Sequence, residues 1–168
     1  MRFALAWAVI SMTLMAQTPE ERQHAVDYLQ STREAFAAET NGLSEDQARY
    51  KSAPEKWSIA EIAEHITATE AFVFELLKKK MKEPATPGKK DAVRGKEQMI
   101  HRAVPSRSRK VNAPEEVRPA GRWGTLRETR EAFERTRQQT IDFVKLSKED
   151  LRSWHHPHFM LGDMDIYQ

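Results

Sequence analysis

The chain has 168 residues, of which 39% are hydrophobic and 31% charged, and it contains no cysteine. This length is typical of one domain with a single core. Six glycines and eight prolines are too few for a collagen-like or low-complexity chain. The absence of cysteine excludes a disulfide framework, thiolate metal sites and a cysteine nucleophile, so a metal site would need His, Asp, Glu or water. The net charge of +2 predicts no polyanionic partner.

Residues 1–16 have the pattern of a secretory signal peptide. Arg2 is followed by an apolar run over residues 3–16, and small Ala16 precedes polar Gln17. A helix over that run would reach about 21 Å, short of the ~30 Å core of a bilayer. We therefore expect cleavage and a periplasmic or secreted location, with one domain at residues 17–168. The alternative is a buried N-terminal helix.

Three capping boxes of the Ser/Thr-x-x-Glu type predict where the long helices begin. They lie at residues 18–21, 58–61 and 125–128. The first helix is predicted to end at Asn41, the second before Pro84 and the third after Val144. The apolar stripe of the second helix consists of Ile59, Ile62, Ala63, Ile66, Val73 and Leu77.

Residues 84–122 show no regular apolar period and contain five prolines. The wider segment 78–122 holds 14 Lys/Arg and five Asp/Glu, a local charge of +9. Such a segment can attract phosphates or anionic surfaces, but it has no aromatic side chain between Glu75 and Arg122 for stacking on bases. We expect a long basic, solvated loop at 84–122 and no nucleic-acid partner.

The last predicted helix is only begun. Asp163 follows Gly162 as a candidate N-cap close to Gln168, and no stretch of useful length alternates as a β-strand does. Capped amphipathic helices without strands predict an all-α fold, an antiparallel four-helix bundle with the fourth helix begun at the C-terminus.

Common catalytic motifs are absent. The remaining candidates for a metal site are the single residue His65 and a cluster of three histidines near the C-terminus. His65 lies within the second helix, where it is either a metal ligand or a histidine satisfied within the core or a groove. Glu61 and Thr69, one turn away on either side, could orient its ring. The cluster His155, His156 and His158 is dense enough for metal. However, adjacent side chains and Pro157 suit a single ion poorly, which favours a structural role in a loop.

The segment Pro54-Glu55-Lys56-Trp57-Ser58-Ile59-Ala60-Glu61-Ile62-Ala63-Glu64-His65-Ile66 resembles the signature that opens the second helix in the DinB/YfiT-like superfamily. The sequence His156-Pro157-His158-Phe159, followed by Gly162, is similar to the lead into the fourth helix of that family. The resemblance extends in order and spacing over residues 18–168.

The resemblance implies a four-helix bundle that binds a divalent metal, zinc or nickel, through three histidines. His65 corresponds to one of them. The other two form an H-x-x-x-H pair on the fourth helix, which we expect beyond Gln168. Family chemistry implies a metal-dependent thiol S-transferase or hydrolase acting on a small molecule, with Glu61 supporting His65.

The alternative from another class is a non-enzymatic helical binding module that uses the bundle mouth or the basic loop. Neither interpretation requires a membrane span, and both allow a homodimer.

Overall fold

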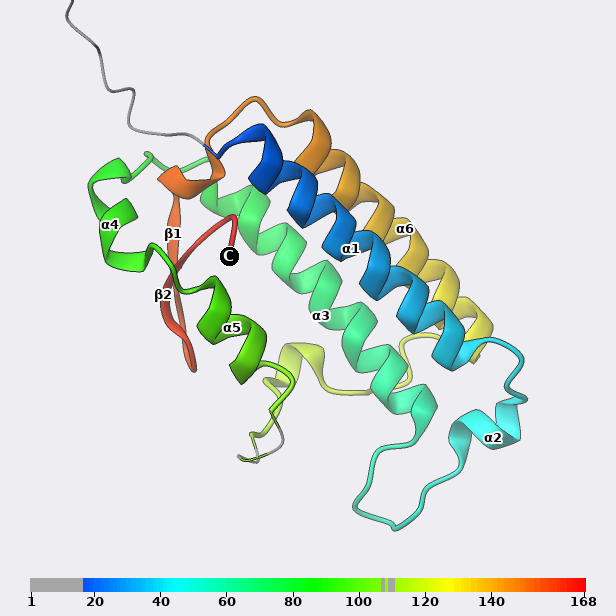
Figure 1. Ribbon diagram of the computed structural model, residues 1–168. Coiled ribbons are helices and arrows are strands. Elements are labelled where there is room, and N and C mark those ends of the chain that lie inside the picture. The colour runs from blue at the N-terminus through cyan, green and yellow to red at the C-terminus, as the bar shows by residue number, and fades with distance from the viewer. Residues whose placement is uncertain (1–16, 107, 109–110) are drawn as a thin grey trace, which may run out of the picture.

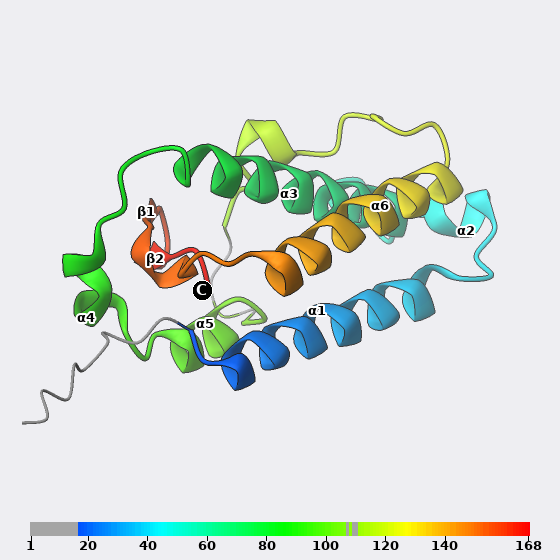
Figure 2. The same cartoon turned by 90° about the horizontal axis from the view of Figure 1, so that it is seen from above.

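The computed structural model describes residues 17–106, 108 and 111–168, so the predicted signal segment 1–16 lies outside the described residues. Three long helices form the body of the domain: α1 (Pro19–Thr40), α3 (Ile59–Lys80) and α6 (Leu126–Leu146). Helix α6 packs against both α1 and α3, and lies between them when the molecule is seen from above (Figures 1 and 2). The prediction of an all-α bundle is confirmed.

All three predicted capping boxes are present at the starts of these helices. The hydroxyls of Thr18, Ser58 and Thr125 accept the backbone N–H groups three residues on, at 3.1, 3.2 and 3.2 Å. In return, the Glu side chain at each third helical position accepts the N–H of the cap residue. Each box satisfies backbone donors that a helix end leaves free, which is why local sequence predicted these starts.

Short elements fill the connections. Helix α2 (Glu45–Arg49) follows α1, and the segment expected as a basic loop contains η1 (Pro87–Lys89), α4 (Lys90–Val93), α5 (Glu97–Ala103) and η2 (Glu115–Val117). Two side chains of this segment are buried, Val93 at the end of α4 and Val117 in η2. The segment expected as a long basic, solvated loop therefore contains short helices and two buried side chains.

The expectation of a fourth helix starting at Asp163 is wrong. After η3 (Leu151–Ser153), the strands β1 (His155–His158) and β2 (Gly162–Asp165) form an antiparallel hairpin, with Pro157 opposite Asp163. Pro157 favours an extended conformation at His156, and Gly162 adopts the positive φ of +71° that the turn requires. Pairing with β1 satisfies backbone groups that the first turn of a helix would leave open.

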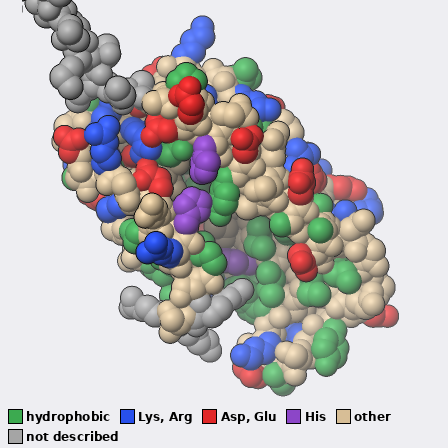
Figure 3. Space-filling model, viewed as in Figure 1, with side chains coloured by type: hydrophobic (Ala, Val, Ile, Leu, Met, Phe, Trp, Pro, Cys, Tyr) green, Lys and Arg blue, Asp and Glu red, His purple; other side chains and the backbone are tan. Residues whose placement is uncertain are grey.

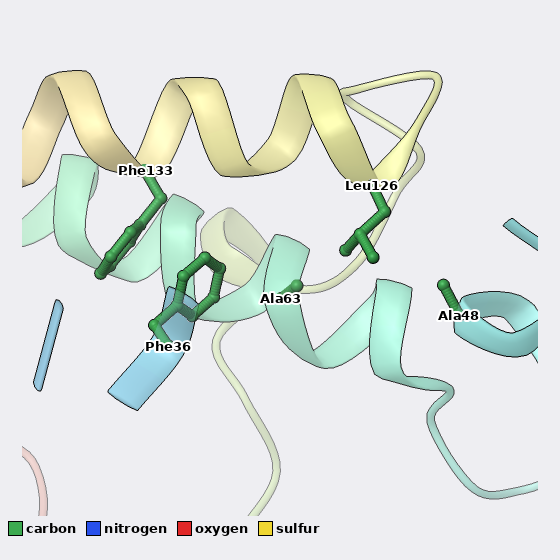
Figure 4. Packing of buried hydrophobic residues seen from close by; sticks show 5 residues of the cluster. All are labelled: Phe36, Ala48, Ala63, Leu126 and Phe133. Atoms are coloured by element: carbon green, nitrogen blue, oxygen red, sulfur yellow. The ribbon is translucent and has the colours of Figure 1, made fainter. Parts of the chain in front are cut away.

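The main hydrophobic core joins all three long helices and α2. Its buried members are Phe36, Ala48, Ala63, Leu126 and Phe133, shown in Figure 4. The rings of Phe36 and Phe133 pack with centroids 4.0 Å apart, so α1 and α6 are in direct aromatic contact. A second cluster, Leu151, Trp154 and Ile166, anchors the hairpin beside α3.

Helix α3 carries two apolar faces. Ala63, Thr67 and Phe74 are buried, whereas Ile59, Ile62, Ile66 and Val73 remain exposed. The predicted stripe therefore mixes core positions with surface positions. Within the described part of the chain, no helix is long and apolar enough to cross a membrane.

Candidate functional site

A groove opens between α1 and α3, with α6 as its floor. Its volume is about 350 Å³. The lining residues are Leu29, His65, Ile66, Thr69, Glu70, Val73, Phe74, Leu77 and Thr140. On this side of the molecule, Figure 3 shows a hollow bordered by hydrophobic and histidine side chains. The volume lies in the range of small-molecule pockets, and His65 is one of the side chains that line the groove.

His65 is held in one orientation and one tautomer. Its Nδ1 lies 2.8 Å from the carbonyl oxygen of Val117, and its ring packs on Trp57 with centroids 5.1 Å apart. Because a carbonyl only accepts, Nδ1 is the donor of this bond, and the tautomer that fits it has its lone pair on Nε2. No described residue bonds to Nε2. Metal-binding histidines commonly show this pattern, with one nitrogen held by a carbonyl and the other left to the ion.

The neighbouring residue Glu64 holds the loop that supplies this carbonyl. Its buried carboxylate accepts the backbone N–H groups of Ala120, Gly121 and Arg122 at 2.8, 3.0 and 3.1 Å, and the Arg122 guanidinium at 2.9 Å. Burial alone would raise the pKa of Glu64, but these donors outweigh it and hold the pKa below its usual value. Glu64 thus fixes the segment after η2, and with it Val117.

The floor of the groove contains a buried ion pair between α3 and α6. Arg137 donates to both oxygens of Glu70, at 2.7 and 2.6 Å, and Thr140 donates to the same carboxylate at 3.1 Å. Arg137 also donates to Thr32 and to the carbonyl of Leu29 on α1, at 2.6 and 2.8 Å. Glu70 is therefore occupied in joining the three helices.

Glu61 does not support His65 as predicted. Its carboxylate accepts the Ser58 N–H and the Lys51 ammonium, both at 2.8 Å. Thr69 donates to the backbone oxygen of His65 at 2.7 Å, and no hydrogen bond among the described residues joins it to the ring. The partner that orients the ring, Val117, is 52 residues away, and no local pattern could identify it.

Two of the three histidines of β1 have structural contacts. His155 is buried, and its Nδ1 lies 2.9 Å from the hydroxyl of Thr86, whereas Nδ1 of His158 accepts the N–H groups of Met160 and Leu161 in the turn. Burial lowers the pKa of both rings, so both favour the neutral form. The hairpin uses two of these histidines to fix its turn and its contact with the segment after α3.

The orientation of His65 suits one metal ligand, but the described residues do not supply the further ligands that an ion needs. Nowhere in residues 17–106, 108 and 111–168 do three His, Cys, Asp or Glu side chains come close enough to hold one ion. Glu70, the acidic side chain that lines the groove, is bonded to Arg137 and Thr140.

Fold and site together define an all-α bundle protein with an open groove beside an oriented histidine. The chain belongs to the DinB superfamily, whose family model matches residues 28–166, from within α1 to the end of the hairpin. Searches of curated proteins and of solved structures found no match to this chain.

Proposed function

We propose that this protein is a metal-dependent enzyme of the thiol S-transferase or hydrolase type. Its metal would be anchored by His65 at the α1–α3 groove. The orientation of His65 by Val117 carries the proposal, because it leaves Nε2 as a lone pair beside an open groove. Zinc or nickel bound there would supply Lewis acidity that lowers the pKa of a thiol or a water molecule.

The residues of the chain itself would orient the ligand and shape the site. Val117 keeps the proton on Nδ1, and Glu64 keeps the Val117 segment in place through its bonds to residues 120–122. The apolar side chains that line the groove would reduce the water around a bound ligand, which would strengthen polar interactions there. The further ligands of the ion would be water or groups outside the described residues.

Calorimetric titration of the chain with zinc and with nickel tests the proposal, with the bound metal measured directly. We expect one-to-one binding in the wild type that His65→Ala abolishes. His156→Ala is the matched control, because it removes a histidine of the hairpin and should leave binding intact. Binding that survives His65→Ala would contradict the proposal, as would a wild type that binds neither ion.

A second candidate is a module that binds an apolar small molecule without catalysis. The wall residues Leu29, Ile66, Val73, Phe74 and Leu77 support it, because they make the groove mainly apolar. An environment-sensitive apolar dye should then bind wild type and His65→Ala equally well, in the absence of metal. Turnover that disappears together with metal in His65→Ala would exclude this alternative.

The proposed location remains periplasmic or secreted, with residues 1–16 as a signal peptide. The pattern of Arg2, the apolar run and Ala16 supports it. Mass spectrometry of the protein recovered from a producing cell would test it. A mature N-terminus near Gln17 is the expected result.

A further inference from the structure

The side chains that line the α1–α3 groove change from polar to apolar along α3. One row of the lining consists of His65, Thr69, Val73 and Leu77. These residues follow one another at intervals of four, so they lie on one side of the helix. At 1.5 Å per residue, the row extends over about 18 Å. His65 and Thr69 form its polar end, and Val73 and Leu77 form its apolar end. The groove therefore suits an elongated molecule with two unlike ends.

The polar groups of the lining accept hydrogen bonds from a ligand but have no donor left for one. The Thr69 hydroxyl donates to the backbone oxygen of His65 at 2.7 Å. The Thr140 hydroxyl donates to Glu70 or to a helix carbonyl, both at 3.1 Å, and Nδ1 of His65 is bonded to Val117. All lining residues lie beyond the first turn of their helices, so their backbone N–H groups are bonded within the helices. What remains is lone pairs, on Nε2 of His65 and on the two hydroxyl oxygens.

The charged side chains at the groove are already paired. Arg137 neutralises Glu70 through two hydrogen bonds. At the apolar end, the ammonium of Lys78 lies 4.9 Å from the centroid of the Phe74 ring, and it is paired with Glu75 at 2.5 Å. A carboxylate or an ammonium group placed among the lining residues would lose hydration without gaining a free counterion. The groove therefore favours an uncharged ligand.

We propose that the groove binds an uncharged, largely apolar molecule that ends in one hydrogen-bond donor, such as a hydroxyl. In the metal-free chain, this donor would bond to Nε2 of His65, beside Thr69. The apolar body would lie on Val73, Phe74 and Leu77 whether or not an ion is bound. The volume of about 350 Å³ has room for roughly ten non-hydrogen atoms, at about 30 Å³ each. This inference rests on the site of the proposed function, and it deepens that proposal by naming the class of ligand.

Calorimetric titration with three eight-carbon probes tests the class of ligand. The probe 1-octanol has the donor, its isomer 1-methoxyheptane only accepts hydrogen bonds, and octanoate carries a charge. In buffer with a chelator, the wild type should bind 1-octanol with a Kd of about 1 mM or lower. It should bind 1-octanol at least about 5-fold more tightly than the ether, which leaves Nε2 unpaired. The preference over octanoate should be at least about 10-fold. No binding of 1-octanol, or equal affinity for either of the other probes, would overturn the proposal.

Three variants locate the ligand and its donor. Val73→Trp should weaken binding of 1-octanol at least about 10-fold, because the larger side chain would occupy the groove. Ile62→Trp is the matched control, since Ile62 lies on α3 outside the lining and is 44% exposed, against 42% for Val73. His65→Leu should bind 1-octanol and its isomer equally, because the acceptor is gone. A preference for 1-octanol that survives His65→Leu, or equal effects of the two Trp variants, would contradict the proposed binding mode.

The zinc and nickel titration separates this inference from the proposed function. The measurements with 1-octanol contain no metal, so neither result depends on the other. Metal binding without a preference for 1-octanol would overturn this inference alone. A preference for 1-octanol in a chain that binds neither ion would support this inference and contradict the metal-dependent enzyme.

Discussion

Removing one partner of the Arg137–Glu70 pair should destabilise the domain far more than removing both. The Arg137 side chain is only 9% exposed and that of Glu70 13%, so each is largely out of water. Arg137→Leu would leave the carboxylate of Glu70 with only the hydroxyl of Thr140 as a partner. Losing one side of such a pair costs about 3–5 kcal/mol, whereas replacing both sides with apolar groups is often close to neutral.

The double-mutant cycle of Arg137→Leu and Glu70→Leu measures this coupling. For a domain of this size, 3–5 kcal/mol corresponds to a decrease in Tm of about 6–20 °C in each single variant. Urea unfolding of the two single variants, the double variant and the wild type gives the four free energies. We expect the double variant to be clearly more stable than the sum of the single effects implies. Strict additivity, or single effects below about 1 kcal/mol, would refute the view that this is a desolvated pair joining the three helices.

Two further predictions concern loop anchors. Glu64→Gln should cost about 2–4 kcal/mol at neutral pH, because one carboxylate acceptor becomes a donor facing N–H groups. Since the folded-state pKa of Glu64 is depressed, its contribution is complete above the unfolded-state pKa of about 4.3 and is lost as pH falls through the folded-state value. The variant should lack that component of acid unfolding, and an unchanged pH profile would argue against the anchor. Gly162→Ala should lower the free energy of unfolding by about 1–2 kcal/mol, because φ at this position is +71°, which a side chain disfavours. Thermal unfolding measures the loss, and Gly88→Ala is the control because Gly88 lies outside the left-handed region. Equal effects of the two substitutions would contradict the strain argument.

Local signals were sufficient for the starts of the long helices and insufficient for the hairpin. The capping boxes at Thr18, Ser58 and Thr125 involve only neighbouring residues, so their sequence was enough to identify them. The hairpin depends on pairing across a turn and on anchors elsewhere, such as the bonds from Arg152 to Asp165 and Glu21. Without those contacts, Gly162-Asp163 is typical of a helix start.

The sequence could likewise predict one part of the candidate site and not the other. His65 could be selected from the sequence by its place in the family signature and in the stripe of its helix. Glu61 could not be excluded as its partner, because helical spacing permits the contact and only the competing bond to Lys51 removes it. The true partner, Val117, contributes a backbone carbonyl, and its own side chain holds no information about that role.

The sequence by itself determined the all-α class, the helix starts, the family and the position of His65, because each depends on residues within about a turn of one another or on a contiguous motif. The tertiary structure decided which face of α3 is buried, which nitrogen of His65 bonds to the backbone and that residues 155–165 form a hairpin. Those features arise from contacts between segments distant in the chain. Packing and long-range hydrogen bonds, rather than local preference, select among the arrangements that the same local sequence allows.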